Sequence, residues 1–170
     1  MRSNGPGLVR AIVCDVILTT PTSPDEAPQN NAPTITVKGL WDTGATGSVI
    51  NKRVADALGI KPIGKTLVHH ADGSTERDVY LVNIILPSNV GFPGVRVTEG
   101  TIAGVDMLIG MDVINAGDFS ITNHNGSTVA TFRVPSCHEI DYVKIINSEV
   151  KQRQLDKYLP RPKKKHGMRR

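Results

Sequence analysis

The chain has 170 residues, which is enough for one domain with a buried core and some additional segments. Hydrophobic residues make up 39% of it and aromatic residues only 4%, so we expect a core of Val, Ile, Leu and Ala. The net charge of +4 comes from the last ten residues, which hold six of the 20 Lys and Arg and none of the 16 Asp and Glu. The rest of the chain is slightly acidic, which argues against a basic folded body.

Cysteine content and hydropathy narrow the class of protein further. The only cysteines, Cys14 and Cys137, exclude a disulfide framework, and we interpret them as buried free thiols. No stretch approaches the ~20 apolar residues that span a bilayer, and no apolar N-terminal segment with a cleavage site is present. The sequence therefore predicts a soluble, cytoplasmic protein without a membrane partner.

The N-terminal part alternates between strand-like and turn-rich segments. Residues 8–18 are rich in β-branched residues and predict a strand, whereas the four prolines of residues 19–33 predict a loop. Residues 34–41 alternate between polar and apolar and predict the strand that leads to Asp42. Residues 51–58 predict a helix, with Asn51 as its N-cap and Gly59 as its stop.

The middle of the chain predicts a hairpin followed by a loop and short strands. Residues 65–70 and 75–86 flank Asp72-Gly73, a pair that favours a tight turn between strands. Residues 87–94 contain two prolines and predict a turn-rich loop. Two short strands are predicted after it, at 95–97 and 101–103.

Four elements are predicted in the last third. Residues 107–109 predict a buried strand, and residues 111–115 a short helix that ends near Gly117. A second hairpin, with strands 119–122 and 128–134, turns at Asn125-Gly126. We place one folded domain at residues 7–136.

The C-terminal region differs in character from the domain. Apolar residues recur at helical spacing among charges, which predicts a helical extension over 139–159 that lies across the body or a partner; they are Val143, Ile146, Val150, Leu155, Tyr158 and Leu159. Residues 160–170 predict a disordered basic tail.

The stretch from Trp41 to Ile50 contains the clearest candidate for chemistry. Asp42 follows an apolar run and precedes Thr43 and Gly44, and the chain then returns to the apolar strand that begins at Ser48. Asp and Gly are poor strand formers, so their place between two strands requires a reason. Gly44 allows a sharp turn and Thr43 can fix the loop through its hydroxyl.

These residues resemble the active-site loop of the aspartic proteases, and most closely that of the retropepsin-like branch. The pattern apolar-apolar-Asp-Thr-Gly-Ala is followed by a second motif at residues 105–114, which resembles the family's apolar-apolar-Gly-x-Asp/Asn element. The resemblance covers residues 9–134. It implies an all-β, retropepsin-like closed barrel with one or two short helices, to which the C-terminal helix and basic tail are added.

The resemblance implies an aspartic endopeptidase with Asp42, Thr43 and Gly44 as catalytic residues. Such chemistry needs two carboxylates that share one proton, because one group cannot both hold and accept a proton. The chain is too short for a two-lobed pepsin-like enzyme and has one Asp-Thr-Gly. The second Asp42 must therefore come from another copy, which implies a homodimer that acts on a peptide or protein substrate.

The resemblance also implies which residues bind substrate. Ala45 and Thr46 would line the cleft, and the hairpin tip would close over the peptide as a flap; its residues are His70, Ala71, Asp72, Gly73 and Ser74. The tip differs from the Gly-rich viral flap. Viral relatives often have an acidic residue where Thr46 stands and an Arg where Met111 stands, so that ion pair is missing.

The remaining polar residues receive structural interpretations. We interpret Asp112 as a helix cap or hydrogen-bonding residue beneath the loop, and Asp106 as a surface or structural residue. Adjacent strand residues such as His69 and His70 point to opposite faces, so no metal site and no cofactor are predicted.

Two other functions remain open from the sequence. The same fold could be a catalytically silent dimeric binding module. Alternatively, the tail at residues 161–170 could bind nucleic acid electrostatically, although no aromatic residues accompany its charges for base stacking.

Overall fold

The structure is a computed structural model that describes residues 2–4, 7–21, 32–70 and 73–158. It consists of two compact units, Met1–Cys137 and His138–Arg170. Of the segments predicted above, most of the Pro-rich loop and the basic tail lie outside the described residues.

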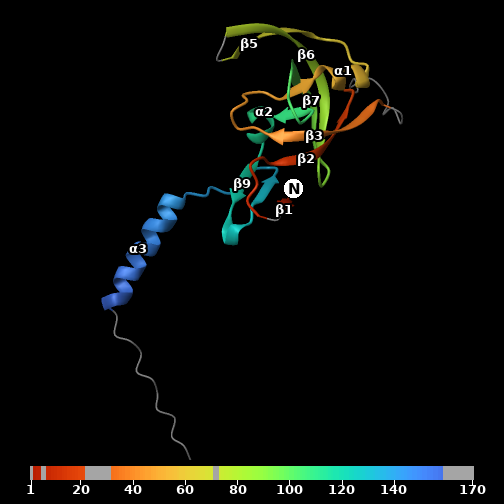
Figure 1. The fold of residues 1–170 in the computed structure, drawn as a ribbon. Coiled ribbons are helices and arrows are strands. Elements are labelled where there is room, and N and C mark those ends of the chain that lie inside the picture. Colours follow the sequence, from red (N-terminus) through yellow and green to blue (C-terminus); the bar gives the residue numbers. More distant parts are fainter. Residues whose placement is uncertain (1, 5–6, 22–31, 71–72, 159–170) are drawn as a thin grey trace, which may run out of the picture. The chain divides into compact units, whose positions relative to one another are not determined.

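Six strands of the first unit form a closed ring (Figure 1). In order around the ring they are β2 (Val13–Thr19), β3 (Thr34–Trp41), β8 (Met107–Ile109), β4 (Val49–Asn51), β7 (Val90–Gly100) and β6 (Gly73–Leu86). The ring closes because β6 also pairs with β2. The predicted all-β closed barrel is therefore confirmed.

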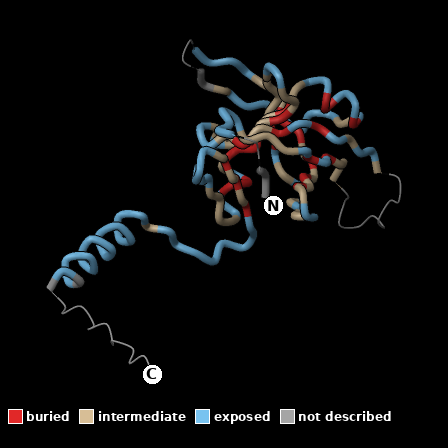
Figure 2. Tube along the Cα trace, turned by 60° about the horizontal axis from the view of Figure 1, so that its bottom comes forward, coloured by how far each residue is buried: buried red, intermediate tan, exposed pale blue. Residues whose placement is uncertain are grey.

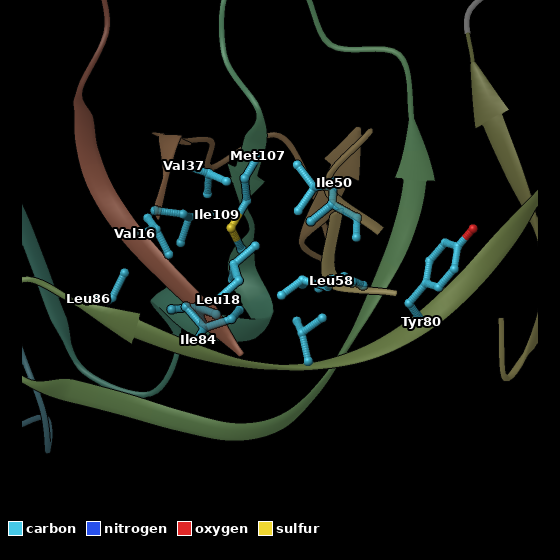
Figure 3. Packing of buried hydrophobic residues seen from close by; sticks show 14 of the residues in the cluster. Val16, Leu18, Val37, Ile50, Leu58, Tyr80, Ile84, Leu86, Met107 and Ile109 are labelled. Carbon is cyan, nitrogen blue, oxygen red and sulfur yellow. The ribbon is translucent and has the colours of Figure 1, made fainter. Parts of the chain in front are cut away.

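The barrel encloses a core of aliphatic side chains. Along β6 the alternate residues Tyr80, Val82, Ile84 and Leu86 are buried, which is the pattern of a strand with one face toward a core. Figure 3 shows Ile84 near Leu18 of β2, and Met107 near Ile109 on β8. Burial of these apolar side chains stabilises the barrel, and the barrel supports the loop that carries Asp42.

A second, three-stranded sheet has the order β1 (Arg2–Asn4), β10 (Val129–Arg133) and β9 (Asp118–Thr122). The predicted hairpin at Asn125-Gly126 connects β9 to β10 through the 3-10 turn His124–Gly126. Phe119 of β9 stacks on Trp41 with ring centroids 4.9 Å apart, and the ring of Phe132 lies at the same distance, tilted. The small sheet thus packs on the residue that precedes Asp42.

The described part of the domain contains two short α-helices, α1 (Lys52–Leu58) and α2 (Met111–Ile114), both at predicted positions. Gly59 ends α1 in the left-handed conformation, as expected. Asn51, however, makes no side-chain cap. Its amide instead donates to the Val105 carbonyl at 2.8 Å and its oxygen accepts from the Ile102 N–H at 2.8 Å.

Two strand predictions are wrong, one at its start and one in full. Residues 8–12 are irregular, and β2 begins only at Val13. Residues 101–103 form no strand, because the side chain of Asn51 binds the polar backbone groups of Ile102.

The segment predicted as a loop at residues 87–94 is mostly strand. The turn covers only the first three residues, and β7 runs through Pro93. The ladder tolerates this proline because the register with β6 shifts there, between Val82 and Ile84. At this register shift Gly94 has a φ of 62°, and its N–H donates to Asn83 Oδ1 at 2.9 Å.

The predicted C-terminal helix is present as α3 (Tyr142–Tyr158) in the second unit. Its apolar residues from Tyr142 to Leu155 are exposed rather than buried, and Figure 2 colours most of this helix as exposed. Within the described residues, no helix is long and apolar enough to cross a membrane. That α3 lies across the body or a partner stays a prediction.

Both cysteines are free, but they are not both buried. Cys14 is half-buried and accepts a hydrogen bond from Trp41 Nε1 at 3.3 Å, and burial raises the pKa of its thiol. Cys137 is exposed, so the prediction of two buried thiols is wrong for it. It lies after the last strand, where Asp118 binds its N–H at 2.8 Å.

Tyr80 gives the fold a predictable sensitivity to alkali. Burial, then a hydrogen bond from its hydroxyl to Glu99 at 2.9 Å, raises the pKa of Tyr80 from 10.0 to about 12. Because the unfolded state ionises first, the stability due to neutral Tyr80 is complete below pH 10 and is lost as the pH rises to about 12. Urea unfolding at a series of pH values should show this loss, and Tyr80→Phe should lack it. Identical alkaline slopes in the two proteins would contradict the assignment.

Candidate active site

Asp42 lies at the end of β3, on the loop that connects β3 to β4. Strand β3 pairs in parallel with β8, with Trp41 opposite Ile109, and the N–H of Asp42 donates to the Ile109 carbonyl at 3.0 Å. Trp41 and Ile109 are both buried, whereas Asp42 is half-buried. The barrel therefore fixes the backbone of Asp42 while its carboxyl group remains accessible.

The loop holds the carboxylate in one orientation. The N–H of Gly44 donates to Asp42 Oδ1 at 2.8 Å, and the N–H of Ala45 donates to the Asp42 carbonyl at 3.3 Å. Among the described residues, no donor other than Gly44 binds this carboxylate. One carboxylate oxygen is thus oriented by the backbone, and the other accepts no hydrogen bond from the described residues.

The second sequence motif fixes the far end of the same loop. Asp112 accepts from the N–H of Ser48 at 2.9 Å and from its hydroxyl at 2.8 Å. The same Ser48 hydroxyl accepts from the N–H of Gly110 at 3.1 Å, and Ser48 is only 1% exposed. Asp112 is therefore the hydrogen-bonding residue beneath the loop that the sequence predicted.

The backbone at Gly110 lies very close to the backbone at Gly47. A Cβ on Gly110 would lie 2.5 Å from the carbonyl carbon of Gly47, which no side chain tolerates. The N–H of Met111 donates to the Ala45 carbonyl at 2.9 Å. Helix α2 thus begins directly against the loop, and Gly110 permits the contact.

The predicted catalytic and cleft residues share this loop. Thr43, Gly44 and Thr46 are exposed, and Ala45 is half-buried. Among the described residues, the hydroxyl of Thr43 binds nothing within the chain, so it does not fix the loop as the sequence suggested. The carboxylates of Asp42 and Asp112 fix the loop instead.

The predicted flap residues lie on a different element. Strand β5 (Gly64–His70) pairs with β6 so that His70 stands opposite Gly73, which confirms the hairpin. Gly73 and Ser74 are exposed on it. Ala71, Asp72 and the side chain of His70 lie outside the described residues.

The sequence analysis did not identify Ser48 as a residue that fixes the loop, whereas Asp106 has the structural role that was predicted for it. Ser48 was interpreted only as the start of a strand, although a lone hydroxyl in an apolar run is a signal for a buried hydrogen bond. Asp106 accepts from the N–H of Lys38 at 3.1 Å and pairs with the Arg53 guanidinium. Within the described part of the chain, no three His, Cys, Asp or Glu residues group as metal ligands.

Removal of the Asp112 carboxylate should loosen the loop. Asp112→Ala leaves the buried polar groups of Ser48 without their acceptor, which costs about 1–3 kcal/mol of unfolding free energy. Chemical denaturation monitored by circular dichroism would measure this. Asp56→Ala is the control, because Asp56 makes only an exposed ion pair with Lys52. Equal stabilities of the two variants would contradict the role of Asp112.

Comparison with known proteins agrees with the motifs. Residues 30–113 match a family model described as aspartyl protease. None of the curated proteins matches the chain. A crystal structure of a retropepsin-like aspartic protease from Rickettsia conorii is similar at 13% identity and a TM-score of 0.40, over 72% of this chain and 94% of that one.

Two further solved structures are similar. The retroviral protease-like domain of Ddi1 from Leishmania major has 25% identity and a TM-score of 0.39, over 63% of this chain and 89% of that one. The solution structure of the protease from Simian Foamy Virus (mac) has 20% identity and a TM-score of 0.36, over 47% of this chain and 81% of that one.

Proposed function

Over residues 30–113 the chain belongs to the aspartyl protease family, and from this premise we propose that it is an aspartic endopeptidase that acts as a homodimer. The observation that carries the proposal is the geometry of Asp42. Its carboxylate is held by the Gly44 N–H at 2.8 Å, on a loop anchored at both ends to the barrel core. A fixed, accessible carboxylate of this kind is what proton-transfer chemistry requires.

The reaction needs a second carboxylate, which the proposed dimer supplies. Two Asp42 groups about 3 Å apart share one proton, because like charges at that distance do not both ionise. The ionised Asp42 takes a proton from water, and this water attacks the peptide carbonyl. The protonated Asp42 donates a hydrogen bond to the carbonyl oxygen and stabilises the charge that develops there. No acyl-enzyme forms.

We propose that substrate binds as an extended peptide above this pair. Ala45 and Thr46 follow Asp42 on the same loop and would contact the peptide backbone. The hairpin tip from His70 to Ser74 would close over the peptide and exclude water other than the attacking molecule. The apolar character of the surrounding chain favours pockets for hydrophobic side chains.

Digestion of a peptide library by the purified protein tests the proposal. We expect cleavage at mildly acid pH, inhibition by pepstatin-like compounds, and greatly reduced cleavage by Asp42→Asn. Cleavage by Asp42→Asn at a rate close to that of the wild type would contradict the assignment. A folded dimer that cleaves no peptide under any of these conditions would support a silent binding module instead.

A further inference from the structure

A row of neighbouring residues crosses the barrel wall beside the loop of Asp42. Leu40 of β3 stands opposite Leu108 of β8, and Leu108 stands opposite Val49 of β4. Val49 in turn stands opposite Thr98 of β7. Residues opposite each other on neighbouring strands point to the same face of a sheet. These four residues, which we call the Thr98 strip, therefore line one continuous part of that face.

The Thr98 strip lies on the same face of the wall as the carboxyl group of Asp42. The strand neighbours of its members point into the barrel: Ile109, Ile50 and Val97 are buried, and Figure 3 shows Ile50 and Ile109 in the core. Because side chains alternate between faces along a strand, the strip points away from the core. Asp42 comes two residues after Leu40, and its N–H continues the ladder to the Ile109 carbonyl. Its side chain therefore leaves the wall on the face of the strip.

Thr98 gives this otherwise aliphatic strip one hydroxyl group. Thr98 is half-buried, and its N–H donates to the Ser48 carbonyl at 3.0 Å, which fixes its backbone to the end of the catalytic loop. Among the described residues its hydroxyl binds nothing, and none of their buried side-chain oxygens lacks a partner, so this hydroxyl is accessible. A Cβ on Gly100 would lie 2.6 Å from Val49 Cγ1, so the Val49 side chain fills that place beside Thr98.

We propose that Thr98 is a specificity-determining residue of the peptidase, whose hydroxyl hydrogen-bonds a hydroxyl or amide group in a substrate side chain. This inference rests on the proposed function, because a peptide cleaved at Asp42 lies on this face. An aliphatic substrate side chain would cover the Thr98 hydroxyl without giving it a partner, which is unfavourable. A threonine side chain is the best match, since its methyl group contacts the aliphatic neighbours and its hydroxyl both donates and accepts. This subsite thus differs from the apolar pockets expected elsewhere in the cleft.

The spacing of the strands limits which substrate residue is recognised. Thr98 is three strands from Leu40, or about 14 Å across the wall, and an extended peptide rises by about 3.3 Å per residue. The recognised side chain therefore lies within about four residues of the scissile bond. In a homodimer the strip occurs twice, so the preference should appear once on each side of that bond.

Peptide pairs that carry Thr or Val at one position test the proposal, because the two side chains have the same shape and differ in the hydroxyl. Labelled peptides selected for binding to the Asp42→Asn protein are remade with Thr or Val at each position in turn. Fluorescence anisotropy with Asp42→Asn gives Kd, and hydrolysis by the wild type gives kcat/KM. At one position on each side, Thr should be favoured over Val by about 2- to 10-fold, the effect of one neutral hydrogen bond. Adding Thr98→Val should abolish or reverse this preference in both assays.

Thr36→Val is the matched control. Thr36 is exposed on the same face of β3, opposite Ile17, and comes six residues before Asp42, about 20 Å away. Valine is a good strand residue, so both variants should fold, which urea unfolding checks. Thr36→Val should keep the preference for Thr. A preference that survives Thr98→Val, or peptides that bind without any preference between Thr and Val, would overturn the proposal.

The outcomes separate the subsite from the catalytic proposal. Wild-type protein that cleaves peptides without a preference dependent on Thr98 would exclude this subsite and leave the peptidase intact. A binding preference that depends on Thr98, in a protein whose wild type cleaves nothing, would support the subsite and contradict the peptidase. Failure of every peptide to bind would overturn both.

Discussion

Asp42→Asn is expected to reduce the rate of peptide hydrolysis by about 10²–10⁴-fold or more, the range that general acid–base catalysis contributes. The amide retains the size of the side chain and can still accept the Gly44 hydrogen bond, so the loop should keep its shape. The amide cannot take a proton from water, however, and a dimer with two amides has neither an acid nor a base at its centre.

The measurement is kcat with a cleavable peptide, together with unfolding of both proteins by urea. Asp15→Asn is the control, because it makes the same chemical change, a carboxylate to an amide, at an exposed site. Asp15 lies on the barrel wall and forms an exposed ion pair with Lys38. Activity of Asp42→Asn within a few-fold of the control would contradict the catalytic role of Asp42.

Gly110→Ala is expected to reduce both stability and activity. The added methyl group would lie 2.5 Å from the carbonyl carbon and 2.6 Å from the carbonyl oxygen of Gly47, so one backbone must move. Gly110 has φ −88°, which alanine adopts freely, so the cost comes from the contact and not from the backbone conformation. Forced contacts of this kind cost about 1–3 kcal/mol, sometimes more.

Movement of Gly47 would also displace the loop of Asp42, and a shift of about 1 Å can reduce catalysis by about 10²-fold. Gly64→Ala is the matched control, because a Cβ there has no atom within 4 Å and stability should change by less than about 1 kcal/mol. Melting temperature and kcat of both variants check the prediction. A Gly110→Ala protein as stable and active as Gly64→Ala would contradict the close packing of α2 beneath the loop.

Local patterns in the sequence predicted most of the strands, whereas the closed barrel was implied by the resemblance to retropepsin-like proteases. Alternation in residues 34–41 and the turn pairs Asp72-Gly73 and Asn125-Gly126 mark strands and hairpins locally. The loop of Asp42 was recognisable for a similar reason, since a polar motif interrupts two apolar strands. Helix α2 and its strand β8 were found from the second motif.

The errors arose where distant residues decide the local structure. Pro93 was taken as a loop residue, but a register shift opposite β6 accommodates it within a strand. Asn51 was taken as a helix cap, but its amide binds backbone groups some fifty residues away. The role of Ser48 likewise depends on Asp112, 64 residues further on; its hydroxyl suggests a buried hydrogen bond, but local patterns do not identify the partner.

Mixed dimers test most directly whether two copies of Asp42 form one centre. Wild-type and Asp42→Asn proteins would be unfolded together in equal amounts and refolded, so that subunits combine at random, and hydrolysis would be measured at the same total chain concentration as an all-wild-type sample. If each centre needs an Asp42 from both subunits, total activity should be about one quarter of that of an all-wild-type sample, because mixed dimers are inactive. A residual activity of about one half would mean that each chain works alone and would contradict the shared pair of carboxylates.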